Sequence, residues 1–328
     1  MSLKEISANK ILRGIIVFTV YVIVVVVLIR YISENTEMTE RILNAPRVYM
    51  IIGIVTMAAS LFLSALLDVT CADTYGIKLQ VKDAAVFSIV ATAINLVIPF
   101  QMGSMLKAVY YKKKMELSYS RYISIMSGTV VIKLAVTFLF LTLSLLISTF
   151  KWNTGMKIVG IAFLLFLGSV AGVLMLVFLQ EKILIILPFK KYTYPIMRGF
   201  FDILSDKKTM ALCSLNNFAY MILGGIRLSS IFACLGLPAG IVNGMLYWSL
   251  CNVSSAVPIL PGNIGISEAF VGLTNMLFNE DFNAGVSVVL VNRIYYYLVA
   301  IAGALILAVP AWIMYDRASR DKTEAQKT

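Results

Sequence analysis

The chain has 328 residues, of which 60% are hydrophobic and 14% are charged, and long apolar runs recur from one end to the other. This composition indicates a polytopic α-helical membrane protein, and the runs are continuous rather than alternating, which argues against a β-barrel. The sequence contains no histidine and its four cysteines have no metal-ligand spacing, so His-based triads are excluded and we expect neither a metal nor a cofactor.

Six apolar runs are long enough to cross a bilayer, which takes about 20 residues. They cover 11–29, 48–67, 120–148, 156–179, 209–236 and 284–314. The first run has no small-residue cleavage site after it, so it is predicted to be a span rather than a signal peptide. The net charge of +11 comes from basic residues in short loops, which predicts a cytoplasmic positive side rather than a nucleic-acid partner.

Two further apolar regions are broken by proline and glycine. If residues 84–98 crossed the membrane completely, the basic cluster that follows them, from Lys107 to Arg121, would lie on the wrong side. We therefore expect 84–118 to enter and leave on one side. The same reasoning makes 240–278 a second re-entrant hairpin, which enters from the opposite face.

The two regions share a pattern. Pro99-x-x-x-Gly103 precedes a span that contains Lys133, and Pro261-x-x-x-Gly265 precedes a span that contains Arg293. With opposed polarity, this pattern indicates an inverted repeat.

The predicted fold is an all-α polytopic membrane protein with two pseudo-symmetric inverted halves, six full spans and two re-entrant helical hairpins. Residues 1–328 form a single integral membrane domain. Its halves, 1–180 and 209–320, are joined by 181–208, which is either a cytoplasmic amphipathic segment or a plain linker.

Three cations, Lys133, Arg227 and Arg293, fall inside apolar spans. A charge at the bilayer centre costs about 2.5–3.5 kcal/mol on insertion scales, so each must be paired, needed for function or able to reach the interface. Glu268 follows the Pro-Gly break and is the expected partner of Arg293. That pair either binds a headgroup or braces the hairpin.

The predicted substrate site combines these cations with the starts of the two half-helices. Exposed backbone N–H groups and a positive dipole end suit an anion such as lipid phosphate. The expected site residues are Arg227, Arg293, Glu268, Lys133, Asn263, Ser267, Gly265, Gly103, Ser104 and Lys107. Further amides, Asn95, Gln101, Asn216, Asn217 and Asn252, line the same cavity or join helices. Asp68 is expected at a solvated loop edge, and no catalytic residue is assigned.

The stretch "LPGNIGISEAF" followed by "VNRIYYY" resembles the "PGGxGxxEA … R" signature of the lysylphosphatidylglycerol synthase transmembrane family. This family covers flippase-like membrane proteins and the flippase domain of the multiple peptide resistance factors. "NLVIPFQMGSMLKAVYYKKKMELSYSRYISIMSGTVVIKLAV" is similar to its first-half block, and "IRLSSIFACLGLP" to its mid-chain Arg segment. The resemblance covers about residues 10–315.

Three departures from the family pattern stand out. Ser104 replaces a Glu, Ile132-Lys133 replaces Glu-Arg, and Gly262-Asn263 replaces Gly-Gly. They predict that the first half handles a different headgroup or contributes less to binding. We also expect no soluble aminoacyl-transferase domain in this chain, so that a lysyltransferase activity implied by the family name is not expected of it.

The leading hypothesis is a flippase-like translocator in the cytoplasmic membrane, with both termini cytoplasmic. It would move an anionic or aminoacylated phospholipid, or another phosphate-linked lipid. The alternatives are an accessory subunit for a separate lipid synthase or glycosyltransferase, and a secondary transporter of a small anion. The expected partner is membrane phospholipid, with a lipid-modifying enzyme or a homo-oligomer compatible with the sequence.

Overall fold

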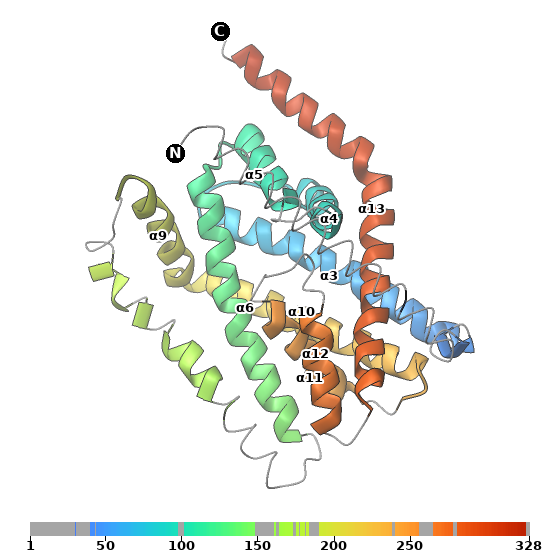
Figure 1. Cartoon of the computed structure of the whole chain (residues 1–328). Coiled ribbons are helices and arrows are strands. Elements are labelled where there is room, and N and C mark those ends of the chain that lie inside the picture. The colour runs from blue at the N-terminus through green and yellow to red at the C-terminus, as the bar shows by residue number, and fades with distance from the viewer. Residues whose placement is uncertain are drawn as a thin grey trace, which may run out of the picture.

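The computed structural model describes residues 30, 40–42, 44–97, 102–147, 161, 164–172, 175–176, 178–180, 182–183, 190–237, 240–255, 265–277 and 281–325. All of the elements in this part of the chain are helices (Figure 1). Their bounds are α3 Arg47–Asp73, α4 Val81–Val97, α5 Met102–Met115, α6 Tyr119–Ile147, α9 Lys190–Ser205, α10 Lys207–Cys234, α11 Ile241–Ser255, α12 Ile266–Leu277 and α13 Phe282–Ala325.

Four of the described helices are long and apolar enough to cross a membrane: α3, α6, α10 and the Phe282–Leu307 part of α13. They coincide with four of the six runs predicted to be spans. The predicted span 11–29 lies outside the described residues, and 156–179 is described only in part, where it is helical. The protein is therefore an all-helical membrane protein with at least these four candidate spans.

Helix α13 continues beyond its apolar part. Pro310 lies inside it and removes one backbone donor from the helical ladder, which favours a bend. Figure 1 shows that the helix changes direction in its C-terminal part.

Helices α3 and α10 end in the same way. Gly76 after α3 and Gly236 after α10 both have positive φ, at 69° and 68°, which glycine adopts without steric cost. The N–H groups of Ile77 and Leu237 then donate to carbonyls in the last helical turn, at 3.1 and 2.9 Å. Both ends are thus Schellman motifs, which satisfy carbonyls that would otherwise be left without a donor.

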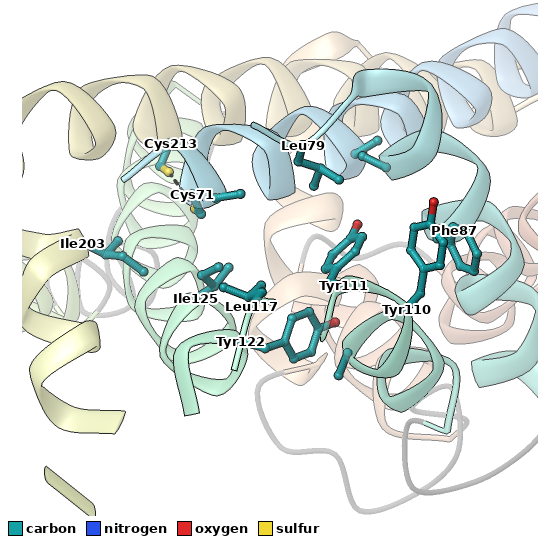
Figure 2. Close-up of a cluster of buried hydrophobic side chains, with 14 of the residues drawn as sticks. Cys71, Leu79, Phe87, Tyr110, Tyr111, Leu117, Tyr122, Ile125, Ile203 and Cys213 are labelled. Atoms are coloured by element: carbon teal, nitrogen blue, oxygen red, sulfur yellow. Dashed lines mark hydrogen bonds between the residues drawn. The ribbon is translucent and has the colours of Figure 1, made fainter. Parts of the chain in front are cut away.

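The described helices pack around α3 and α10, which lie along one another. Helices α4 and α5 contact each other, and α11 contacts α12. One hydrophobic cluster lies where α3, α4, α5, α6, α9 and α10 meet, and it includes three tyrosines, Tyr110, Tyr111 and Tyr122 (Figure 2). In the same view, the sulfurs of Cys71 and Cys213 face each other, 3.5 Å apart.

The amphipathic segment is helix α9. Its apolar residues Phe200, Phe201, Ile203 and Leu204 are all buried, and α9 packs against α6 and α10. Full burial of one such side chain contributes about 1.5–3 kcal/mol. The apolar side of this helix is therefore used to bind the protein core, not the lipid surface that its composition suggested.

Candidate functional site

Two of the predicted intramembrane cations, Arg227 and Lys133, line the same cavity, whose volume is about 170 Å³. They come from α10 and α6, respectively, so residues far apart in the sequence form it. The described polar lining also includes Ser60, Ser64, Thr92, Asn216, Asn217, Tyr220 and Tyr296. None of the described lining residues is Asp or Glu. The cavity therefore combines two positive charges with neutral hydrogen-bonding groups.

Arg227 is held in place by neutral groups. Its Nε donates to Asn292 Oδ1 at 2.7 Å, and its Nη1 donates to Ser60 Oγ at 3.1 Å. The guanidinium also lies over the Trp248 ring, 4.5 Å from the centroid, and the side chain is only 1% exposed. Within the described residues these contacts leave Nη2 without an acceptor. A buried guanidinium with a free donor suits an anionic ligand.

Lys133 has a different setting. Its Nζ lies 5.1 Å from the centroid of the Tyr220 ring, and it has no ion pair with a described carboxylate. A cation–π contact of this kind stabilises an ammonium only partly. Lys133 is thus a second cation in the cavity whose charge no described acidic group balances.

Glu268 and Arg293 form a buried ion pair. Arg293 donates from Nε to Oε1 at 2.5 Å and from Nη2 to Oε2 at 3.1 Å, and Oε2 also accepts the Gly265 N–H at 2.8 Å. Glu268 is therefore both the ion-pair partner that the sequence predicted and a capping residue of α12. Neither residue belongs to the described lining of the Arg227–Lys133 cavity.

Two other predicted site residues belong to the start of α12. Gly265 has φ of 87°, a left-handed conformation that favours glycine. Ser267 exchanges a hydrogen bond with Ser254 of α11 at 2.8 Å, which ties the two short helices together. Asn263 lies outside the described residues.

The predicted site residues Lys107, Gly103 and Ser104 are not part of the described lining of this cavity either. Lys107 forms a buried ion pair with Asp68 and donates to Ser88 Oγ at 3.2 Å, and Tyr111 donates to the same carboxylate at 3.0 Å. The expectation that Asp68 lies at a solvated loop edge was wrong, because Asp68 is only 8% exposed. A buried carboxylate requires a partner, and Lys107 supplies it.

Gly103 and Ser104 are organised by Asn95. The Gly103 N–H donates to Asn95 Oδ1 at 2.8 Å, and Asn95 Nδ2 donates to Ser104 Oγ at 3.4 Å. Asn95 therefore caps the start of α5. Of the other amides, Asn216 and Asn217 line the cavity, Asn252 donates to the Trp248 carbonyl at 2.8 Å, and Gln101 lies outside the described residues.

Sequence reasoning missed three residues that position Arg227: Ser60, Asn292 and Trp248. Asn292 could have been noticed as an amide next to Arg293 inside an apolar span, where polar residues are costly. Ser60 and Trp248 carry no such local signal, since serine and tryptophan are ordinary residues of membrane helices.

The helices and the cavity together define a polytopic α-helical membrane protein with a cationic internal cavity. The chain belongs to the family described as lysylphosphatidylglycerol synthase TM region, whose model matches residues 12–303, as the sequence motifs predicted. Membership indicates a membrane protein of lipid metabolism or transport. Comparison with curated proteins and with solved structures gave no match.

Proposed function

We propose that this protein is a lipid translocator that moves phospholipids across the cell membrane, with the Arg227–Lys133 cavity as the headgroup site. The observation that carries the proposal is a cavity of about 170 Å³ with two cations and no carboxylate among its described lining residues. Lipid phosphate is the abundant anion of a bilayer, and arginine binds phosphate well. Family membership supports a role with lipids.

We further propose that the chain forms two inverted halves, α3–α6 and α10–α13. In these halves α4–α5 and α11–α12 are re-entrant hairpins. Each half has the order long helix, short helix, short helix, long helix. Helices α3 and α10 both end in Schellman motifs, and the next helix begins the same number of residues after Gly76 as after Gly236. The packing is reciprocal as well: α4 contacts α13, and α11 contacts α6.

In this arrangement the buried ion pairs have a structural role. Lys107–Asp68 joins α5 to α3, and Arg293–Glu268 joins α12 to α13. Each pair fixes the second short helix of a hairpin to a long helix of its own half. The headgroup would then pass between the halves at Arg227 and Lys133, with both termini on the cytoplasmic side.

Translocation of fluorescent phospholipids in proteoliposomes tests the function. With dithionite added outside, an active flippase makes inner-leaflet lipid accessible, and we expect at least a tenfold loss of rate in Arg227→Gln and in Lys133→Gln. Lys82→Gln is the matched control, because Lys82 is an exposed cation on α4. Wild-type rates in folded Arg227→Gln would overturn the site assignment.

The same vesicles distinguish the alternatives. Uptake of radiolabelled inorganic phosphate without lipid movement would favour a small-anion transporter. If neither lipid nor phosphate moves, and a lipid-modifying enzyme co-purifies with the protein, the accessory-subunit hypothesis would replace the proposed function.

A further inference from the structure

The contacts of the two cavity cations indicate which net charge the cavity favours in a headgroup. Arg227 contacts Asn292, Ser60 and the Trp248 ring, all of them neutral, and Lys133 contacts the neutral ring of Tyr220. A ligand with a single phosphate therefore meets two positive charges whose field no described lining carboxylate offsets. Buried charges act more strongly than charges at the surface, because the effective dielectric constant around them is lower.

Most of the described groups that could bind an additional ammonium already have a protein cation as their partner. The buried carboxylates Asp68, Asp83 and Glu268 are paired with Lys107, Lys114 and Arg293, and none of them belongs to the described lining. Two of the three described aromatic rings in the lining already carry protein cations: Arg227 lies over Trp248, and Lys133 lies by Tyr220. Among the described rings of the lining, Tyr296 is the one without a protein cation over it.

The cavity is also small. Its volume of about 170 Å³ corresponds to roughly five or six water molecules in the liquid, and pockets for drug-sized ligands measure about 300–1,000 Å³. A phosphate group fits within this space, whereas a long aminoacyl chain would extend beyond it.

We infer that the Arg227–Lys133 cavity selects phospholipids with a net anionic headgroup and discriminates against headgroups that carry an aminoacyl ammonium. The inference rests on the proposed lipid-translocating function and specifies the substrate class of its site. It separates this chain from what the family description would suggest, since a lysylated lipid is cationic at its headgroup.

The test compares three fluorescent lipids with identical acyl chains in the same proteoliposomes: phosphatidylglycerol, phosphatidylethanolamine and lysylphosphatidylglycerol. We expect phosphatidylglycerol to move at least tenfold faster than lysylphosphatidylglycerol, with phosphatidylethanolamine between them. In Lys133→Glu the preference should shift at least tenfold toward the lysylated lipid, whereas Lys133→Gln should lower the discrimination without reversing it.

The outcomes separate the two hypotheses. If the lysylated lipid moves as fast as phosphatidylglycerol or faster, the charge-selection inference is wrong while the translocation hypothesis stands. If no lipid moves, both fail. Because a charge reversal can disturb folding, binding of the three lipids to detergent-solubilised wild-type protein is measured by native mass spectrometry. Equal retention of the lysylated and anionic lipids there would also overturn the inference.

Discussion

Arg293 donates two hydrogen bonds to Glu268, from Nε to Oε1 and from Nη2 to Oε2, and so joins α13 to the first turn of α12. Glu268 is 6% exposed and Arg293 is 9% exposed, so both charged residues are buried together. The same carboxylate accepts the N–H of Gly265 and thereby caps α12. One interaction thus determines where the short helix begins and which long helix it lies against.

We predict that loss of either partner of this ion pair destabilises the protein. Arg293→Ala or Glu268→Ala leaves one buried charge without its ion-pair partner, which costs about 3–5 kcal/mol, whereas replacing both by Arg293→Met and Glu268→Leu should cost less. The free energy of unfolding in detergent is measured for the two single variants and for the double variant. Wild-type stability of Arg293→Ala together with lost lipid movement would instead assign this pair to the substrate.

We predict that Gly103→Ala separates α4 from α5. A Cβ built at Gly103 would overlap the carbonyl oxygen of Ala91, a backbone atom that cannot rotate away. The cost should reach or exceed the upper end of the range of about 1–3 kcal/mol that is typical of overpacking. The control is Gly168→Ala, since the described residues leave open space there, and it should be neutral or stabilise its helix by up to about 1 kcal/mol. Equal thermal stability of the two variants would contradict the close approach.

We predict that Cys71 and Cys213 form a disulfide on oxidation. Their sulfurs are 3.5 Å apart across α3 and α10, so a small movement brings them to bonding distance of about 2.05 Å. A membrane-permeant oxidant such as diamide accepts the two protons and two electrons that the thiols lose. Mass spectrometry of digested protein should find the linked peptides, and Cys213→Ser should abolish them. Linkage of Cys71 to Cys234 or Cys251 would contradict the packing of α3 on α10.

We predict that Asp206 stabilises α10 in a pH-dependent way. Hydrogen bonds from the Thr209 hydroxyl and from the backbone N–H groups of Thr209 and Lys208 lower the pKa of Asp206, which is the N-cap of the helix. A lowered folded-state pKa means that the stabilisation is complete above the unfolded pKa of about 3.9 and is lost as the pH falls through the folded value.

The measurement compares Asp206→Ala with wild type at neutral and acidic pH. The variant should lose about 0.5–2 kcal/mol at pH 7, and the difference should shrink toward pH 3. Asp206→Asn is the matched control, because an amide caps the helix at every pH and asparagine is as good an N-cap as aspartate. A difference between Ala and wild type that does not change with pH would show that the carboxylate charge has no part in the effect.

The repeated Pro-x-x-x-Gly pattern predicted where two helices begin, but not why each glycine is needed. The pattern correctly marked the starts of α5 and α12, but its two glycines serve different purposes. Gly265 adopts a positive φ, and open space surrounds it within the described structure, whereas Gly103 is pressed against the backbone of α4. Sequence identity at matching positions does not reveal which of these two requirements applies.

The sequence alone determined the class of protein, four helices that can span the membrane, the family and the partnership of Glu268 with Arg293. These features follow from long apolar runs, local breaks and the cost of a lone buried charge, all of which are written along the chain. Only the tertiary structure decided that Lys133 and Arg227 line one cavity without Arg293, that Lys107 is neutralised by Asp68, and that Ser60, Asn292 and Trp248 hold Arg227. Such partnerships depend on which faces of distant helices meet. A local sequence pattern does not determine how each helix is rotated about its axis or which helices it packs against.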